Sequence, residues 1–326
     1  MNLQDSGDRP RFSTISFLSD FGHADEFVGV VHSVIRSIAP RASVLDITHG
    51  IADCDVRAGG LALARSADYL VPGVVMAVVD PGVGTNRRAI ALEVGDGQSY
   101  LVGPDNGLLA PVVALVGGAT AAVTLDNPTY QLQSPGSTFD GRDIFAPAAA
   151  HLANGVPIEE LGNSLETTKL TPGLLPVAEE TADGSINAEV LWVDKFGNLQ
   201  LNVDPSQIEG WGSDIRLMVG SQSFGTSPQQ RTLSRVESFA DVGSAGLGMM
   251  TDSNGLCSVV ADRASAAVEL GLSAGDAVEL SPVDGPDPQT KPVRVSLGAT
   301  DGGRESVADS SGSLAGQGIG TGDDVT

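Results

Sequence analysis

The chain has little of what nucleic-acid binding or membrane insertion requires. Only three of its 326 residues are lysines (Lys169, Lys195 and Lys291), and 18 basic against 41 acidic residues give a formal net charge of -23. Phosphate binding needs clustered Lys and Arg, so this balance argues against nucleic acid as a partner. No run of about 18 apolar residues could span a membrane, and the N-terminus lacks the apolar core of a secretory signal. We therefore expect no membrane partner and a cytoplasmic location.

Cysteine and histidine are also scarce. Cys54 and Cys257 are too few and too far apart for a disulfide framework or a zinc site, so we expect both to be reduced, buried thiols. The spacings of the four histidines match no common ligand pattern, and no metal is expected at any of them. They are His23, His32, His49 and His151.

Apolar segments alternate with helical patterns through the first half of the chain. An apolar run over residues 14–18 ends at SDFG, and a helical pattern follows from Phe27 to Ile38. Further strands are predicted over residues 43–47, 74–79, 89–93 and 121–125, and helices over 56–67, 108–115 and 142–153. Buried, β-branched strands that alternate with helices predict an α/β domain with a largely parallel sheet.

The second half predicts short strands separated by polar turns, over residues 189–193, 199–203, 215–219 and 256–260. This pattern favours a smaller all-β domain. Beyond about residue 285 the chain is rich in Gly, Ser, Thr and Asp and has little to bury, so it is predicted to be disordered. The expected organisation is a flexible N-terminus (1–12), an α/β domain (13–178), an all-β domain (186–284) and an acidic tail (285–326).

Polar residues follow several predicted strands, where an open parallel sheet binds its ligands. Asp20 comes directly after the strand ISFLS, and its carboxylate could accept hydrogen bonds from two vicinal hydroxyls or cap the following helix. Asp80 follows another buried strand, and Gly82 and Gly84 in the next turn permit positive φ and close backbone approach. Arg87 can pair with Asp80 across this loop, either to build a site or to staple the loop.

Two turns carry further polar residues. GPDNG places Asp105 and Asn106 after a strand, although an ordinary turn is the stronger local explanation. WVDKFGNLQLN places Asp194 and Asn198 around a Phe-Gly turn, which is by itself a hairpin signal. Each motif alone is therefore weak support for a site.

The stretch TFDGRDIFAP (138–147) encloses charged residues in an apolar frame. Arg142 and Asp143 are expected to start a helix, so free N–H groups would face whatever lies beside Asp140 and Gly141. Plain capping of that helix is the alternative.

Taken together, SDFG (19–22), VVDPGVGT (78–85), PDNG (104–107), TFDGRDIFAP and DKFGN (194–198) resemble the S-adenosylmethionine (SAM) hydroxide adenosyltransferase family, also called adenosyl-forming SAM hydrolases. The resemblance runs from about residue 15 to residue 280, with the motifs in the family's order. Fluorinases and chlorinases share the fold.

The resemblance implies an α/β domain joined to a smaller β-barrel domain. It also implies a homotrimer, with each site between one subunit's N-terminal domain and a neighbour's C-terminal domain. The implied reaction is attack of water on the ribose C5′ of SAM, giving adenosine and methionine. SAM is the substrate, and no cofactor is implied.

By this resemblance, Asp80 and Arg87 belong to the family's Asp-Arg-His triad that handles the water. The family's histidine position carries Asp140 here, so the chain departs from the pattern at a catalytic position. Asp140 could accept the proton of the water or pair with Arg87. His23, on the Asp20 loop, is the candidate histidine to replace the missing one.

The implied substrate contacts lie in both domains. Some relatives carry an arginine for the methionine carboxylate where this chain has Asn254. The implied contacts are Asp20 (ribose hydroxyls), Asn106, Phe139, Asp194 (methionine ammonium), Asn198 (adenine edge), Phe239 (adenine face), Ser253 with Asn254 (methionine carboxylate) and main-chain groups near Arg263 (adenine pocket).

Two other functions stay open on the sequence. A non-catalytic SAM- or adenosine-binding protein would result if Asp140 does not replace the histidine. A SAM-dependent halogenase ranks below hydrolysis, because Asp80 and Asp140 would repel a halide ion.

Overall fold

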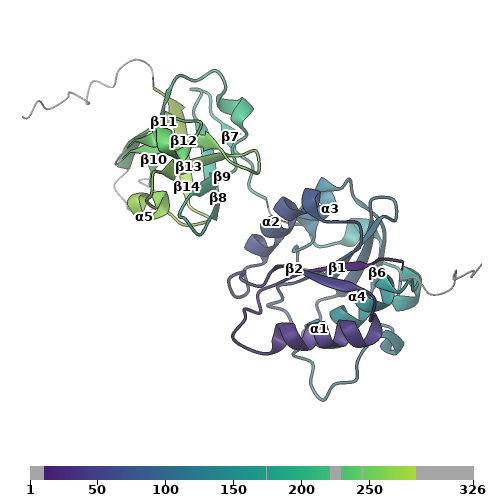
Figure 1. The fold of residues 1–326 in the computed structure, drawn as a ribbon. Helices are drawn as coiled ribbons and strands as arrows, with labels where there is room; N and C mark the ends of the chain where they lie inside the picture. The colour runs from purple at the N-terminus through teal and green to yellow at the C-terminus, as the bar shows by residue number, and fades with distance from the viewer. Residues whose placement is uncertain (1–10, 174, 221–228, 244–245, 284–326) are drawn as a thin grey trace, which may run out of the picture. The chain divides into compact units, whose positions relative to one another are not determined.

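The structure is a computed structural model that describes residues 11–173, 175–220, 229–243 and 246–283. Most of the predicted flexible N-terminus and all of the predicted disordered tail lie outside these ranges. No helix among the described residues is long and apolar enough to cross a membrane. An α/β domain and an all-β domain follow one another along the chain (Figure 1).

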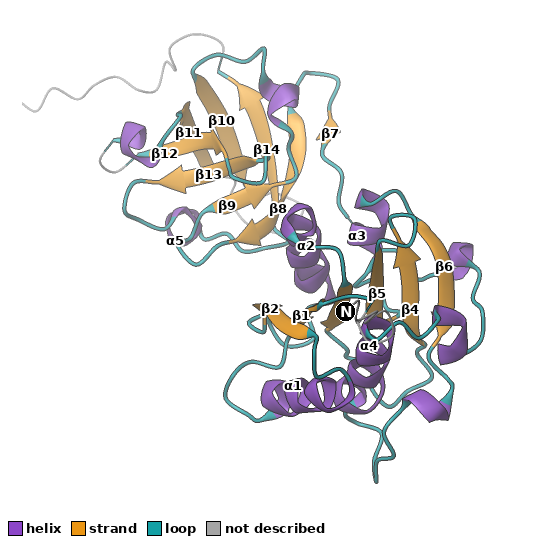
Figure 2. Ribbon diagram, turned by 45° about the vertical axis from the view of Figure 1, so that its right-hand side comes forward, coloured by secondary structure: helices purple, strands orange, loops and turns teal. Residues whose placement is uncertain are grey.

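The first domain is built on a six-stranded, mostly parallel sheet in the order β2-β1-β3-β5-β4-β6 (Figure 2). Its parallel strands are β1 (Thr14–Ser19), β2 (Ser43–Thr48), β3 (Val74–Val78) and β5 (Ser99–Pro104). In contrast, β4 (Ala89–Val94) is antiparallel to β5 and to β6 (Ala119–Thr124). The loop before β4 contains no helix, whereas a parallel crossover usually needs one. The predicted sheet is thus confirmed, but the strand predicted over residues 89–93 runs against the parallel strands.

Helices cover both faces of this sheet (Figure 2). On one face, α1 (Phe27–Ile38) and α4 (Ala146–Ala153) pack with alternate strand side chains such as Phe17 and Met76. On the other face, α2 (Val56–Ser66) and α3 (Ala110–Leu115) pack with the intervening ones, such as Leu18 and Ala77. This follows from the two-residue period of a strand, which sends successive side chains to opposite faces.

The helix predicted over residues 142–153 begins as a π-helix, Gly141–Phe145, and continues as α4. The backbone N–H groups of Arg142 and Asp143 both donate to the carbonyl oxygen of Phe139, over 3.0 and 3.1 Å. The expectation that these N–H groups are free to face a group beside Asp140 and Gly141 is therefore wrong. The tight turn satisfies them within the chain, and π-helical turns occur frequently at functional sites.

The second domain is a closed seven-stranded barrel, in agreement with the predicted all-β domain. Its strands follow the order β14-β10-β11-β12-β13-β9-β8, and β14 pairs with β8 to close it. The short β7 (Glu179–Glu180) also pairs with β8. The barrel elements are β8 (Ile186–Val193), β9 (Leu199–Leu201), β10 (Asp214–Val219), β11 (Gln229–Arg235), β12 (Leu247–Thr251), β13 (Cys257–Ala261), α5 (Ala266–Leu270) and β14 (Ala277–Pro282).

Short 3₁₀ turns complete both domains. In the α/β domain they are Ala67–Tyr69, Pro128–Tyr130, Ile158–Leu161 and Thr167–Lys169, and in the barrel Pro205–Ile208 and Phe239–Val242.

The two cysteines lie in different environments. Cys257 is buried in β13, where burial raises the pKa of its thiol to about 11. It therefore stays protonated and unreactive. Cys54 is exposed, with a φ of 63°, so the prediction of a buried thiol is wrong at this position.

Candidate active site

The carboxyl ends of β1 and β3 bring two acidic residues to one edge of the α/β sheet. Ser19 at the end of β1 pairs in register with Val78 at the end of β3, and the N–H of Asp20 donates to the carbonyl oxygen of Val78 over 3.4 Å. Asp80 follows two residues after Val78. The structure thus places side by side two candidates that the sequence located only at the ends of separate strands.

Two glycines shape the loop that returns Arg87 to Asp80. Gly84 has a φ of +75°, and a Cβ atom there would lie 3.0 Å from the carbonyl oxygen of Ser137. Gly82 does not need a positive φ. A Cβ atom on Gly82 would instead lie 3.1 Å from Cγ of Arg87, so its missing side chain makes room for the arginine.

Arg87 joins two carboxylates in a buried cluster. Its Nε donates to both oxygens of Asp80, over 3.0 and 2.9 Å, and its Nη2 pairs with Asp80 and with Oδ2 of Asp140. The side chains of Asp80, Arg87 and Asp140 are 6%, 12% and 12% exposed. Two carboxylates and one guanidinium group therefore lie in contact with little access to solvent.

Contacts within this cluster stabilise the positive charge of Arg87. Burial alone would lower the pKa of Arg87, but the hydrogen bonds and charges of Asp80, and then those of Asp140, raise it above its usual value. Arg87 therefore stays protonated. Of the two roles left open for Asp140, the pairing with Arg87 is present, and no hydrogen bond among the described residues uses its other oxygen, Oδ1.

Aromatic packing fixes the segment that carries Asp140. The ring of Phe139 makes edge contacts with Phe21 and Phe27, with centroids 5.8 and 5.1 Å apart. A Cβ atom on Gly141 would lie 2.8 Å from Cζ of Phe21, so only glycine allows this approach. The SDFG and TFDG loops are thereby packed against each other.

Two further ion pairs support the surrounding loops. Arg142 donates to both oxygens of Asp143, over 2.7 and 2.8 Å, so these two charges of TFDGRDIFAP neutralise each other. Arg88 donates to Asp105 over 2.7 Å, and Asp105 also accepts the N–H of Thr171 over 2.8 Å. The GPDNG motif is therefore more than an ordinary turn, because its aspartate links three segments.

Asp20 binds the backbone of a distant loop. Its Oδ2 accepts the N–H of Cys54 over 2.9 Å, whereas the N-cap of α1 is Glu26. The capping alternative for Asp20 is therefore wrong. Burial raises the pKa of Asp20; the Cys54 N–H opposes this shift, and the negative charges of Asp53 and Asp80 add to it.

The remaining candidates of this domain are placed as follows. Asn106 donates to the carbonyl oxygen of Val79 over 2.8 Å and accepts the N–H of Leu108 over 3.1 Å, so its amide anchors the turn after β5 to the end of β3. His23 packs edge-on against His49, with ring centroids 5.4 Å apart. Among the described residues it makes no hydrogen bond to the Asp80–Arg87–Asp140 cluster, so the structure gives no support for His23 as a replacement for the family's histidine.

Family models match both domains. That of the SAM hydroxide adenosyltransferase N-terminal domain matches residues 15–162, and that of the C-terminal domain matches residues 188–279. The chain belongs to this family.

Individual relatives agree with this assignment. The (R)-S-adenosyl-L-methionine hydrolase of Salinispora tropica is 42% identical over 267 residues, which cover 82% of this chain and 97% of the relative. The hydrolase of the same name from Thermus thermophilus is 39% identical over 275 residues, covering 82% and 98%. A fluorinase of Actinopolyspora mzabensis is 26% identical over 307 residues, covering 86% and 99%. Halogenating relatives are thus more distant than the hydrolases.

A solved structure shows the same fold. An uncharacterized conserved protein from Thermotoga maritima superposes with a TM-score of 0.73 at 32% identity, covering 82% of this chain and 99% of the other.

In the C-terminal domain of this family member, Asp194 and Asn198 form hydrogen bonds within the turn between β8 and β9. Asp194 Oδ1 accepts the N–H groups of Phe196 and Asn198, over 2.8 and 2.9 Å, and its Oδ2 accepts from the Asn198 side chain over 2.8 Å. The hairpin interpretation accounts for all three bonds. The oxygen of the Asn198 side chain makes no further hydrogen bond within the described residues.

The other barrel candidates lie on exposed turns. Phe239 is 47% exposed at the start of a 3₁₀ turn. Ser253 and Asn254 are exposed in the turn between β12 and β13, where the Asn254 N–H donates to Asp252 over 2.8 Å. Arg263 has a φ of 52°, and its side chain is 92% exposed.

Two contacts that stabilise the site were not predicted from the sequence. Cys54 binds Asp20 through its backbone from 34 residues away, and no local pattern could pair them. Phe21 was noticed only as part of SDFG. The signal that could have revealed its role is Gly141, because a glycine permits a close approach that a Cβ atom would block.

Proposed function

We propose that this protein hydrolyses S-adenosyl-L-methionine by attack of water at the ribose C5′, giving adenosine and L-methionine. The observation that carries the proposal is the buried Asp80–Arg87–Asp140 cluster at the carboxyl edge of the sheet. It stands in a chain whose relatives at 39–42% identity are named (R)-S-adenosyl-L-methionine hydrolases.

The reaction needs little covalent help from the protein. The water oxygen forms a bond to C5′, the C5′–S bond breaks, and its electron pair stays on the sulfur of methionine. One proton of the water is released. The sulfonium is already a strong leaving group, so the protein must mainly exclude bulk water and align the nucleophile with the carbon.

The geometry of the cluster suits a site that binds the sulfonium and positions the water. Arg87 holds Asp80 and Asp140 together, and the excess negative charge favours a sulfonium cation nearby. Asp140 is the proposed proton acceptor, because Arg87 occupies its Oδ2 and leaves its Oδ1 without a hydrogen bond among the described residues. Asp20 is proposed to bind the ribose hydroxyls.

The excess negative charge also disfavours halide as the nucleophile. We therefore rank halogenation below hydrolysis. Cofactor independence, a homotrimer and cytoplasmic location remain predictions from the sequence and the family resemblance. So do the substrate contacts at Asn106, Phe139, Asp194, Asn198, Phe239, Ser253, Asn254 and Arg263.

Product analysis tests the proposal. Purified protein is incubated with SAM in a chloride-rich buffer, beside a sample without protein that measures spontaneous decay, and the products are identified by mass spectrometry. We expect adenosine and methionine above the background. Formation of 5′-chloro-5′-deoxyadenosine would instead identify a halogenase, and tight SAM binding without any product would identify a binding protein.

The non-catalytic alternative is favoured by one observation, the aspartate in place of the family's histidine. Asp140→His separates the two functions. A lower rate of adenosine formation in this variant would show that Asp140 is adapted to the reaction. Turnover that appears only in the variant would show that the natural chain is a binding protein.

Asp20→Asn is expected to weaken SAM binding about 10- to 100-fold without lowering stability at pH 7. A hydrogen bond to a charged group contributes about 1.5–3 kcal/mol, which accounts for the loss of affinity. The raised pKa means that the folded state takes up a proton more readily than the unfolded chain, so ionised Asp20 destabilises the fold at pH values above its unfolded pKa. Asparagine removes that charge and keeps an acceptor for Cys54.

Calorimetric titration and thermal melts from pH 3 to pH 8 measure both effects, with the exposed Asp25→Asn as the matched control. Any gain in melting temperature in Asp20→Asn should disappear toward pH 3. A lower melting temperature than wild type at pH 7, or unchanged SAM affinity, would contradict the assignment.

A further inference from the structure

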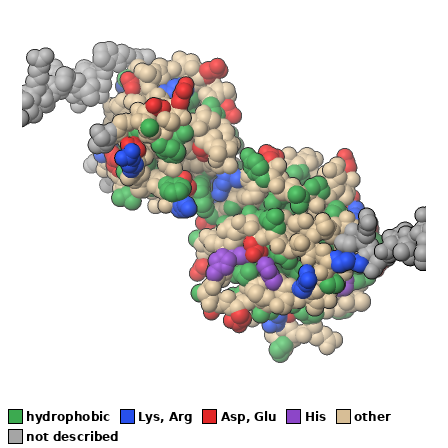
Figure 3. Space-filling view, in the orientation of Figure 1, with side chains coloured by type: hydrophobic (Ala, Val, Ile, Leu, Met, Phe, Trp, Pro, Cys, Tyr) green, Lys and Arg blue, Asp and Glu red, His purple; other side chains and the backbone are tan. Residues whose placement is uncertain are grey.

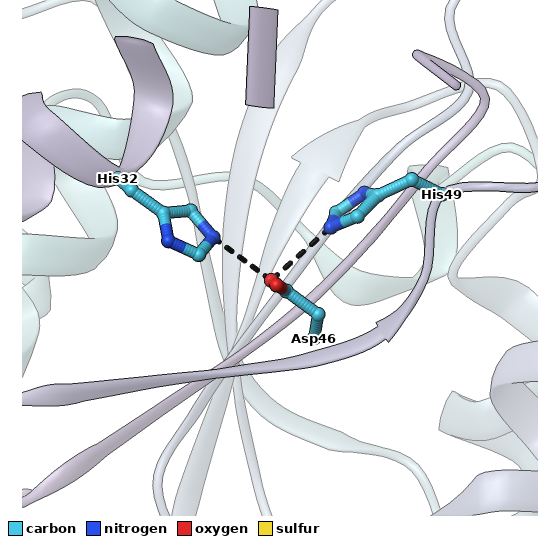
Figure 4. A group of neighbouring side chains, drawn as sticks. All are labelled: His32, Asp46 and His49. Atoms are coloured by element: carbon cyan, nitrogen blue, oxygen red, sulfur yellow. Dashed lines mark hydrogen bonds and ion pairs between the residues drawn. The ribbon is translucent and has the colours of Figure 1, made fainter. Parts of the chain in front are cut away.

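Two histidines and an aspartate of the α/β domain, His32, His49 and Asp46, point toward one another (Figure 4). His32 lies on α1, Asp46 on β2, and His49 directly after β2. The Nε2 atoms of His32 and His49 lie 2.9 and 3.1 Å from the same oxygen of Asp46, Oδ1. On the α/β domain, histidine side chains gather at the surface beside an acidic side chain (Figure 3).

The inner histidine has an unsatisfied nitrogen. His49 is 1% exposed, and its Nδ1 lies 2.7 Å from Oγ of Ser19. Its Nε2 is near Asp46 but not in hydrogen-bond geometry, so this buried atom has no hydrogen-bond partner among the described residues. A lone pair on Nε2 would face a carboxylate, and a proton on Nε2 would lie near Asp46 Oδ1, 3.1 Å from Nε2, without good hydrogen-bond geometry. Buried polar atoms without partners are rare in folded proteins.

A metal ion would satisfy all three side chains at once. Zinc binds imidazole nitrogen and carboxylate oxygen at about 2.0–2.2 Å, so the ligand atoms of a tetrahedral site lie about 3.3 Å apart. The nitrogen–oxygen distances of 2.9 and 3.1 Å come close to this separation, and the three ligand atoms all lie within 4.8 Å of one another. Small side-chain shifts would therefore complete a coordination shell.

We propose that His32, Asp46 and His49 bind a divalent transition-metal ion, with zinc as the best fit to this ligand set. The proposal replaces the expectation that none of the histidines binds metal. The site is distinct from the Asp80–Arg87–Asp140 cluster and does not rest on the proposed hydrolase function.

The surroundings match those of bound metals. The Ser19 hydroxyl orients the His49 ring, as hydrogen-bond partners of metal-binding histidines do. The ring of Phe17 lies 4.6 Å from the His49 ring and 6.3 Å from the His32 ring and forms an apolar wall. The side chains of His32 and Asp46 are 36% and 40% exposed, which leaves an access route and room for a water ligand.

The site is also linked to the Asp20 loop, because the Ser19 hydroxyl lies 2.7 Å from Nδ1 of His49. Ser19 immediately precedes Asp20 in sequence. A bound ion would therefore tie α1 and β2 to the strand end that carries Asp20.

Zinc binding by the full chain tests the proposal. After the protein is stripped with a chelator, calorimetry and equilibrium dialysis with zinc chloride should show one ion per chain with a micromolar or tighter dissociation constant. His32→Gln and Asp46→Asn should each weaken binding at least ten-fold. Both side chains are partly exposed, so we expect the variants to fold, as circular dichroism will verify.

His151→Gln is the matched control. His151 lies on α4 and packs against Tyr130, with ring centroids 4.9 Å apart, so its loss should leave zinc affinity unchanged. Cobalt(II) provides a spectroscopic check, because the visible absorption of a low-coordinate His and carboxylate site should appear in wild type and vanish in His32→Gln.

Wild-type zinc affinity in both His32→Gln and Asp46→Asn would overturn the proposal. Weak binding spread over several sites of the acidic surface would overturn it as well. Failure of the proposed hydrolase function is recognised separately, since it would appear as absent adenosine formation whatever the zinc stoichiometry.

Discussion

Asp80→Asn is expected to lower the rate of adenosine formation from SAM by about 10²- to 10⁴-fold, the usual effect of removing a group that handles a reacting proton or nucleophile. Asparagine has the size of aspartate and keeps one oxygen to accept the hydrogen bond from Arg87 Nε, which contacts both oxygens in the native cluster. The guanidinium also keeps Asp140 as a partner. The variant should therefore lose catalysis and keep its fold.

Initial rates by chromatography and thermal melts measure the two effects. The matched control is Asp68→Asn, an exposed aspartate in the 3₁₀ turn after α2, which should show the wild-type rate. A wild-type rate in Asp80→Asn would show that the cluster takes no part in the reaction. A lost rate with a melting curve like that of the wild type would place the effect in the chemistry or in substrate binding, and calorimetry with SAM separates these two.

Arg87→Met should have the largest effect on stability, a loss of about 3–5 kcal/mol, because removing one partner of a buried ion pair leaves uncompensated charge. Here two carboxylates, Asp80 and Asp140, would lose their shared counter-ion at side-chain exposures of 6% and 12%. Methionine fills similar space and can pack against the ring of Phe145, which lies 5.3 Å from the guanidinium carbon in the native cluster. Turnover should be lost as well.

Urea unfolding measures the loss. Arg231→Met, at an exposed position of β11, is the matched control and should change stability by no more than about 0.5 kcal/mol. Adding Asp140→Asn to Arg87→Met should recover part of the stability, because one of the two buried negative charges disappears. An Arg87→Met variant as stable as the control would mean that the cluster is well solvated.

The sequence predicted those helices and strands whose apolar pattern matches the side chains that the fold buries. The buried strand before SDFG and the helix from Phe27 to Ile38 have strong periodicity, and the structure places them within a residue of the expected bounds. The pairing of Asp80 with Arg87 was also predictable, because a short loop with two glycines joins them.

Elements that depend on distant contacts were not predictable in this way. The polar strand β11, QQRTLSR, has a single buried residue, Leu233, and owes its conformation to pairing with β10 and β12. The antiparallel direction of β4 was signalled only by the Gly-Asp-Gly turn at residues 95–97, a common hairpin signal. The convergence of His32, Asp46 and His49 requires α1 to pack beside β2, so no spacing rule could reveal it.

The two adjacent arginines before β4 limit which changes of length the loop between β3 and β4 can accept. Arg87 pairs with Asp80 and Asp140, whereas Arg88 pairs with Asp105, so neighbouring side chains serve different loops. Deleting one residue between Gly84 and Arg87 would move Arg88 toward the position of Arg87, and inserting one would move Arg87 toward the position of Arg88. Surface loops usually tolerate such length changes, but this one should accept substitutions far more readily than insertions or deletions. In a library of random variants, the spacing from Asp80 to Arg88 should therefore be retained even where the intervening residues change.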